Sequence, residues 1–305
     1  MSDIMELTSP ARVIPVSRFA TFLELTKPRI SALVLVTTSV GFYLAAQGFS
    51  HWMDLLRMIH ALVGTALVAA GANTINQYLE VEWDRRMART QMRPLPSGRL
   101  AANEALGFGL LSAAGGVLYL SLFANPLAGL LAALSFAVYV FAYTPLKRRT
   151  PFCVYVGAIS GALPPVIGWA AGAGTLDLEA WLLFAILFFW QLPHFAAIAW
   201  LYRDDYARAG FPMIGVPDGK GSQTDLHVVT HTVALLMASL LPVRFGTAGV
   251  AYAVAATLLG LAFLACSAAF VASKTPGWAK SEILASVVYL PLLFGALLLD
   301  RAIAF

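Results

Sequence analysis

Residues 59–94 have the sequence IHALVGTALVAAGANTINQYLEVEWDRRMARTQMRP, in which an apolar run is followed directly by three carboxylates and four arginines. Residues 61–79 of this segment contain no charged side chain. About 20 predominantly apolar residues in a helix are enough to cross the hydrocarbon core of a bilayer. The segment therefore predicts a transmembrane helix that ends in a charged region at the membrane surface.

The composition of the whole chain supports this interpretation. The 305 residues are 59% hydrophobic and only 12% charged, whereas a soluble domain typically has about 25% charged residues. The mean hydropathy is +0.76 and the sequence pI is about 9.1. Because the basic residues are scattered through short segments between apolar runs, a lipid bilayer explains them better than a nucleic-acid partner does. We expect a polytopic membrane protein that binds no nucleic acid.

Apolar runs of spanning length recur along the chain and predict an all-α fold with about nine transmembrane helices around a central cavity, in a single domain of residues 1–305. The predicted spans are 30–47, 55–79, 104–123, 126–143, 153–173, 180–200, 228–245, 247–272 and 282–303. Residues 1–27 contain no short apolar core with a small-residue cleavage site, so they are expected to remain as a cytoplasmic N-terminal segment. Cys153 and Cys266 are too few and too isolated for a disulfide framework or a metal site, and we interpret them as packing residues.

The distribution of Lys and Arg predicts the orientation. With nine spans, 17 of the 20 basic residues fall on the side of the N-terminus, and the opposite side keeps only Arg57, Arg244 and Arg301. Loops rich in Lys and Arg stay in the cytoplasm. We therefore expect a multi-pass protein of the bacterial cytoplasmic (inner) membrane, with the N-terminus inside and the C-terminus outside. The polar loops 80–103, 144–152 and 202–227 then all lie at the inner face.

The first candidate site is an acidic stripe at the end of the second span. Asn76, Glu80 and Asp84 are spaced four residues apart and would share one face of a continuing helix. Glu82 would face elsewhere, where Arg86 is a suitable ion-pair partner. The alternative is a solvated helix end with ion pairs, but the stripe begins inside the apolar run, at Asn73 and Asn76, where polar side chains are costly and usually functional.

Carboxylate and amide oxygens one turn apart are ligands that suit Mg²⁺, which commonly bridges to substrate phosphates. Arg85, Arg89 and Arg93 follow directly, and arginine binds phosphate oxygens through two parallel donors. Acid, metal and arginine together predict a diphosphate site at the membrane surface.

A second acidic pair, Asp204 and Asp205, follows the sixth predicted span and is followed by Arg208. It would form a second metal-binding corner over the same cavity, although a helix end paired with Arg203 and Arg208 is the simpler alternative. His194 lies inside this span with Gln191 and Pro193, roughly 16 Å along a helix from Asp205 and nearly on the same face. A buried histidine is as readily structural as functional.

Two further segments point to the same site. The polar loop at 144–152, which overlaps YTPLKRRTP at 143–151, supplies Lys147 and Arg148 as candidate diphosphate contacts, although basic anchoring at the membrane surface needs no site at all. GALPPVIGWAAG at 161–172 interrupts the fifth span with two prolines and small residues. That pattern predicts either a broken or kinked helix beside a cavity or close helix packing.

These motifs resemble the UbiA superfamily of intramembrane prenyltransferases, whose pattern is Asn-x-x-x-Asp-x-x-x-Asp after the second helix and a second acidic motif after the sixth. Asn76, Glu80 and Asp84 match the first motif, and Asp204 and Asp205 stand where the second is expected. The segments MARTQMRPLPSGRL, YTPLKRRTP, GALPPVIGWAAG, LPHFAAIAW and DDYARAGFPM are similar to the haem-modifying branch. Two departures are a Glu at position 80 in place of the commoner Asp and a second motif without a clean Asp-x-x-x-Asp.

The resemblance implies transfer of a farnesyl group from farnesyl diphosphate to the vinyl group of haem B (protohaem IX), with water, giving haem O and diphosphate. Haem B is then a substrate, Mg²⁺ is the cofactor, and the product is available to a haem A synthase or a terminal oxidase. His194 would contact the haem iron or handle a proton. The expected catalytic residues are Asn76, Glu80, Asp84, Asp205 and His194; the metal ligands are Asn76, Glu80, Asp84, Asp204 and Asp205; and the diphosphate contacts are Arg89, Arg93, Lys147 and Arg148.

Three other functions compete with this one. Another prenyltransferase of the same superfamily, acting on a quinone or chlorophyll precursor, would share the acidic sites and lack only the haem-branch motifs. A secondary transporter would also have many spans with polar residues, but here the charged groups collect at one membrane face. A non-catalytic haem-binding assembly factor would have no need for paired acidic corners with arginines.

Overall fold

The computed structural model describes residues 17–49, 51–213 and 222–304, and every regular element in these ranges is helical. The elements are α1 (Arg18–Leu25), α2 (Pro28–Ala45), α3 (Trp52–Asp84), α4 (Ala102–Phe123), α5 (Pro126–Ala137), the π-helix η1 (Val138–Tyr143), α6 (Thr144–Leu146), α7 (Cys153–Ala173), α8 (Leu178–Leu201), α9 (Arg203–Ala209), α10 (Ser222–Arg244), α11 (Val250–Ser273) and α12 (Pro276–Ala304). Residues 1–16 of the predicted N-terminal segment, including Arg12, and Lys220 of the third polar loop lie outside the described residues.

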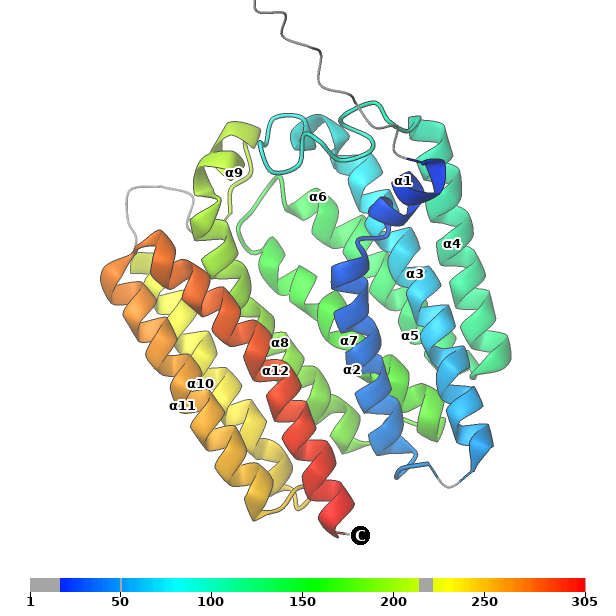
Figure 1. Ribbon diagram of the computed structural model, residues 1–305, viewed down its shortest axis with the longest axis vertical. Coiled ribbons are helices and arrows are strands. Elements are labelled where there is room, and N and C mark those ends of the chain that lie inside the picture. The colour runs from blue at the N-terminus through cyan, green and yellow to red at the C-terminus, as the bar shows by residue number, and fades with distance from the viewer. Residues whose placement is uncertain (1–16, 50, 214–221, 305) are drawn as a thin grey trace, which may run out of the picture.

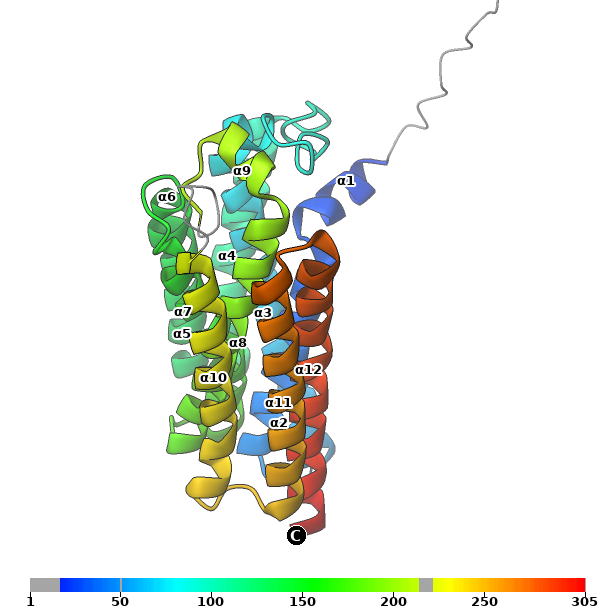
Figure 2. The ribbon, with the colours of Figure 1, turned by 90° about the vertical axis from the view of Figure 1, so that its left-hand side faces the viewer.

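The long helices run side by side in one bundle (Figure 1). The short helices α1, α6 and α9 lie toward one end of this bundle, and the C-terminus lies at the other (Figures 1 and 2). The loops that follow α3 and α6 are at the same end as α9. The structure therefore gathers the described parts of the predicted polar loops at one end of the bundle, as the charge distribution predicts.

Nine helices within the described ranges are long and apolar enough to cross a membrane, which confirms the prediction of a polytopic all-α protein. Their bounds follow the predicted spans closely, with three notable differences. α3 continues from the predicted end at residue 79 to Asp84, α10 begins at Ser222 instead of residue 228, and α12 begins at Pro276 instead of residue 282. In each of these places the helix carries polar residues that hydropathy alone assigns to solvent. The extension of α3 matters most, because it keeps the acidic stripe helical.

Pro164 and Pro165 lie inside α7, which is nevertheless continuous from Cys153 to Ala173, so the predicted break is absent. A proline has no backbone N–H and therefore leaves the carbonyl four residues earlier without its helical donor. For Pro164 that carbonyl belongs to Ser160, and it accepts a hydrogen bond from Ser135 Oγ of α5 at 3.1 Å. A neighbouring helix thus satisfies the freed group, as the membrane interior demands.

Close packing of α2 against α7 confirms the second interpretation of the 161–172 segment. A Cβ atom added to Gly41 of α2 would lie 1.9 Å from the carbonyl oxygen of Pro165, and one added to Gly168 of α7 would lie 1.9 Å from that of Thr38. Backbone atoms this close leave no room for any side chain. Small residues at such crossings let membrane helices approach closely.

We expect Gly168→Ala to lower the thermal stability of the detergent-solubilised protein, because the added methyl group must push two backbones apart, and overpacking costs about 1–3 kcal/mol or more. Gly115→Ala in α4 is the matched control, since nothing lies within 4 Å of a Cβ added there. The melting temperature of both variants checks this. Equal melting temperatures for the two variants would contradict the close α2–α7 contact.

Candidate active site

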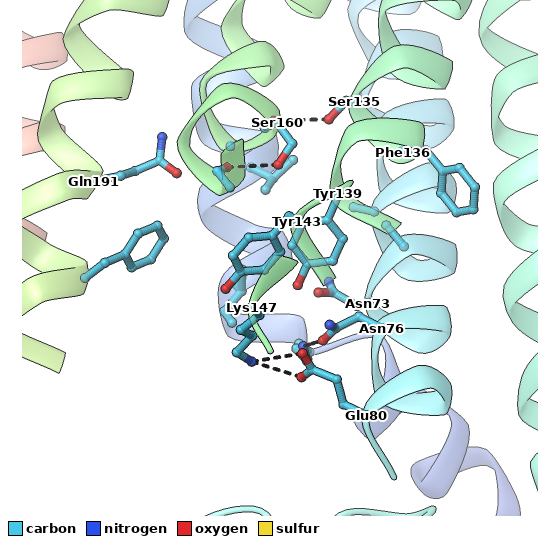
Figure 3. Close-up of a pocket in the computed structure, with 18 of the residues that line it drawn as sticks. Asn73, Asn76, Glu80, Ser135, Phe136, Tyr139, Tyr143, Lys147, Ser160 and Gln191 are labelled. Carbon is cyan, nitrogen blue, oxygen red and sulfur yellow. Dashed lines mark hydrogen bonds and ion pairs between the residues drawn. The ribbon is translucent and has the colours of Figure 1, made fainter. Parts of the chain in front are cut away.

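A cavity of about 350 Å³ opens between α2, α3, α5, η1, α7 and α8. Its size is within the range of small-molecule sites. Most of its wall is apolar, but one end carries a dense group of charged and amide side chains. These polar lining residues are Lys27, Asn73, Asn76, Glu80, Asp84, Arg89, Arg93 and Lys147. Figure 3 shows Glu80 and Lys147 facing each other, with the rings of Tyr139 and Tyr143 next to them and Ser160 and Gln191 farther away.

The acidic stripe on α3 lies where the four-residue spacing predicts it. Asn76, Glu80 and Asp84 are all buried, at 3%, 1% and 0% exposure, and all three line the cavity. Glu82 instead faces solvent and forms an ion pair with Arg85 at 2.8 Å, so the suggested partner Arg86 is wrong. The helical periodicity therefore turns Glu80 and Asp84 toward the cavity and Glu82, which lies between them in sequence, toward solvent.

Each oxygen-bearing side chain of the stripe is held by its own cation. Lys147 Nζ donates to both carboxylate oxygens of Glu80 at 3.1 and 3.0 Å. Arg93 donates to Asp84 Oδ2 at 2.7 Å, and Lys27 Nζ donates to Asn76 Oδ1 at 3.1 Å. Three cations from three parts of the chain thus surround one face of α3. This arrangement can accept a multiply charged anion, because the cations are already in place.

Lys27 is a site residue that the sequence interpretation counted only as a membrane anchor. It precedes Pro28 and adopts the left-handed conformation with φ of 49°, which is uncommon for a residue other than glycine. Burial lowers the pKa of Lys27 to about 7, and the nearby charge of Arg93 adds to this effect. Burial also disfavours the charge of Lys147, but the adjacent Glu80 carboxylate outweighs it and raises the pKa of Lys147.

The donor set of the stripe fits a divalent cation that prefers oxygen ligands. Asp84 Oδ1 is buried and has no hydrogen-bond partner among the described residues, although such an oxygen is costly to leave unsatisfied. Glu80 and Asn76 present further oxygens on the same helix face, one and two turns away from Asp84. A hard cation with some of its own waters, such as Mg²⁺, would satisfy this buried oxygen.

The π-helix η1 places two tyrosines in the cavity wall. π-helical turns are rare and are frequently found at functional sites. The rings of Tyr139 and Tyr143 stack with their centroids 5.3 Å apart, and both line the cavity. Gly157 of α7 makes room for Tyr143, because a Cβ there would lie 2.8 Å from its ring. The sequence interpretation assigned no role to either ring.

The second acidic pair is not part of the cavity wall. Asp204 is largely exposed and lies 4.0 Å from Arg203, while Asp205 forms an ion pair with Arg208. Asp205 also accepts hydrogen bonds from the backbone N–H groups of Ala88 and Arg89 at 3.3 and 3.4 Å. It therefore fastens α9 to the loop that carries Arg89 and Arg93.

Among the described residues, no three His, Cys, Asp or Glu side chains form a group that could hold a metal ion. The structure thus does not bring Asp204 and Asp205 together with Glu80 and Asp84, and a metal shared between the two corners stays a prediction. The ion pairs of Asp204 and Asp205 with Arg203 and Arg208 correspond to the simpler alternative.

Arg148 and His194 also lie outside the cavity lining. Arg148 donates to the carbonyl of Leu79 at 2.9 Å and stacks on the ring of Trp83, 3.6 Å from its centroid. His194 Nδ1 lies 2.6 Å from Ser286 Oγ of α12, and its ring stacks on Trp190. The geometry supports Arg148 as a brace for the end of α3, and the proposed contact of His194 with haem stays a prediction.

The model of the UbiA prenyltransferase family matches residues 34–294 of this chain. The chain belongs to the UbiA prenyltransferase family. It is similar to a protein named protoheme IX farnesyltransferase from Solibacter usitatus, with 46% identity over 92% of this chain and 98% of that protein. A protein of the same name from Opitutus terrae is 42% identical over 93% of this chain and 96% of its own length. The resemblance stated from the motifs is thereby confirmed.

Several solved structures share the fold. A digeranylgeranylglyceryl phosphate synthase aligns with a TM-score of 0.76 and 19% identity over 93% of this chain and 98% of its own. A UbiA homologue from Archaeoglobus fulgidus, bound to GPP and Mg²⁺, aligns with a TM-score of 0.62 and 16% identity over 91% of this chain and 99% of its own. At these identities the likeness establishes the helical architecture.

Proposed function

We propose that this chain is a haem-modifying prenyltransferase that transfers the farnesyl group of farnesyl diphosphate to a vinyl group of haem B, forming haem O and diphosphate. The observation that carries the proposal is one cavity in which acidic, basic and apolar walls meet. The names and the 40–46% identity of the relatives support haem as the acceptor. The quinone and chlorophyll alternatives have no comparable support.

The charged end of the cavity would hold the diphosphate. Arg89, Arg93, Lys147 and Lys27 would donate to its oxygens and stabilise the negative charge that grows as the C1–O bond breaks. Asn76, Glu80 and Asp84 would hold Mg²⁺, which when bound supplies additional stabilisation for the leaving diphosphate. The A. fulgidus homologue bound to GPP and Mg²⁺ supports this pairing of metal and prenyl diphosphate.

The middle of the cavity would accommodate the allylic cation that remains on the farnesyl C1. The faces of Tyr139 and Tyr143 carry partial negative charge and attract cations. The surrounding wall is lined by Val68, Ala69, Phe136 and Ile167, and it would keep water away until the new bond forms. The vinyl group of haem B would donate its electron pair to C1, and water would then add to the resulting cation and release a proton, giving the hydroxyethylfarnesyl group.

The cellular placement completes the proposal. A multi-pass membrane protein with its basic loops inside would present the diphosphate end of the cavity to the cytoplasm, in the bacterial inner membrane. Farnesyl diphosphate would then enter with its charged head at the surface and its tail among the helices. Haem O would leave toward a haem A synthase or a terminal oxidase.

A comparison of acceptors tests the proposal. Membranes that contain the chain would be incubated with farnesyl diphosphate, Mg²⁺ and either haem B or 4-hydroxybenzoate, beside membranes without the chain. We expect a product of haem O mass from haem B and no prenylated 4-hydroxybenzoate. Geranyl and geranylgeranyl diphosphate in parallel would define the prenyl length. Prenylation of 4-hydroxybenzoate alone would contradict the proposal.

A further inference from the structure

A cluster of one tyrosine and two histidines lies outside the cavity, between the starts of α7 and α10. It consists of Tyr155 from α7 and of His227 and His231 from α10. The start of α10 is at the end of the bundle that carries α6 and α9 (Figure 2). None of the three residues lines the cavity, and the described part of α10 contributes nothing to the cavity wall.

Three donor atoms converge in this group. Tyr155 Oη lies 3.2 Å from His227 Nδ1 and 3.3 Å from His231 Nε2. The two histidines are one helical turn apart, and their ring centroids are separated by 4.1 Å. Donors at about 2.0–2.1 Å from a tetrahedral zinc ion are separated from one another by roughly 3.3 Å. The distances of 3.2 and 3.3 Å from Tyr155 Oη to the two imidazole nitrogens therefore match the separation between neighbouring ligands of a tetrahedral zinc ion.

The protonation of His231 also suits a ligand. Its Nδ1 lies 2.6 Å from the carbonyl oxygen of His227. Because a carbonyl can only accept, Nδ1 carries the hydrogen and the lone pair of the neutral ring is on Nε2, which faces Tyr155. A ring N–H fixed by a backbone carbonyl is the usual support of a metal-bound histidine.

We propose that Tyr155, His227 and His231 form a binding site for a first-row divalent transition metal of the Zn²⁺ class, with a fourth position open to water. Tyr155 would ligate as the phenolate, so binding of the ion would release its hydroxyl proton to solvent. Imidazole nitrogen selects such ions over Mg²⁺, which prefers oxygen. Two histidines on one turn of the same helix ligate side by side, so they cannot occupy the opposite axial positions of a haem iron. His227 is buried at 8% exposure, whereas His231 and Tyr155 are half-buried, which leaves a path for the ion.

The bound ion would tie α7 to α10. α7 contributes Val154, Gly157 and Ser160 to the cavity wall, so the ion would stabilise one wall without touching the substrates. Because the ion would bind only the folded arrangement, its binding raises the melting temperature. The proposal is independent of the reaction proposed above.

Metal titration of the purified full chain, produced without a polyhistidine tag and stripped with a chelator, tests this proposal. With excess Mg²⁺ present to fill oxygen sites, we expect one Zn²⁺ per chain, an increase in melting temperature, and a tetrahedral Co²⁺ absorption spectrum. His231→Gln and Tyr155→Phe should each weaken Zn²⁺ binding at least tenfold. The metal-free melting temperature would show that both variants fold.

His60→Gln is the matched control. His60 also hydrogen-bonds a tyrosine, with Nδ1 2.7 Å from Tyr119 Oη, but it has no second histidine beside it. This variant should bind Zn²⁺ as the unmodified chain does. The proposal is overturned if the unmodified chain binds no Zn²⁺, or if His231→Gln and Tyr155→Phe bind it as tightly as His60→Gln does.

Discussion

Asp84→Asn is expected to lower kcat by about a hundredfold to a thousandfold, the range seen when one preorganised charge-stabilising group is removed from an active site. Asp84 is fully buried, holds Arg93 at 2.7 Å, and keeps one carboxylate oxygen without a hydrogen-bond partner among the described residues. The amide keeps the shape but removes the charge that a metal ion requires. Initial rates of haem O formation by purified variants, at several Mg²⁺ concentrations, check this.

Glu82→Gln is the matched control for Asp84→Asn, because it removes a carboxylate from the same helix two residues away. Glu82 is exposed and paired with Arg85, and such surface pairs contribute about 0–1 kcal/mol to stability. Activity should stay within about twofold of the unmodified protein. If Glu82→Gln lowered the activity as much as Asp84→Asn does, the site would not be limited to the carboxylates on the cavity face of α3.

Lys147→Met is expected to have the second largest effect, on both activity and stability. Lys147 and Glu80 are buried together, and leaving one partner of a buried ion pair unpaired typically costs about 3–5 kcal/mol. We therefore expect a lower melting temperature and a loss of haem O formation of at least a hundredfold. In the double variant Glu80→Gln with Lys147→Met, the melting temperature should recover while activity stays lost.

Arg148→Met tests whether Arg148 contacts the diphosphate, as the sequence predicts, or supports the end of α3, as the structure indicates. Arg148 contacts Leu79 and Trp83 outside the cavity, so its loss should lower the melting temperature modestly. The KM for farnesyl diphosphate should change less than about fivefold, which corresponds to less than the 1.4 kcal/mol of a tenfold change. If Arg148→Met reduced activity as much as Lys147→Met does, Arg148 would be a diphosphate contact as the sequence predicts.

The features that could be predicted from the sequence are those that depend on local periodicity. Apolar runs gave the nine spans, and the four-residue spacing placed Asn76, Glu80 and Asp84 on one buried face. In each case a short-range pattern was sufficient, because a helix fixes which side chains share a face. The structure also places Arg89, Arg93 and Lys147 in the cavity lining beside these acids, while their contact with a diphosphate stays a prediction.

The remaining site residues depend on contacts between distant segments. Lys27 reaches Asn76, 49 positions later in the chain, and nothing near Lys27 in sequence distinguishes it from a basic membrane anchor except the proline that follows. The π-helical turn that aims Tyr139 and Tyr143 into the cavity has no periodicity of its own. Asp205 is adjacent to arginine in sequence, but only the fold shows that it binds the backbone of Ala88 and Arg89.

The central claim is that haem B and farnesyl diphosphate react in the cavity bounded by Glu80, Asp84 and Lys147. The most direct measurement incubates purified protein with both substrates and Mg²⁺ and quantifies haem O by mass together with released diphosphate. We predict equal molar amounts of the two products from the unmodified protein, and about a hundredfold to a thousandfold slower formation of both from Asp84→Asn. Equal amounts of haem O from both proteins, or diphosphate release without haem O from the unmodified protein, would contradict the claim.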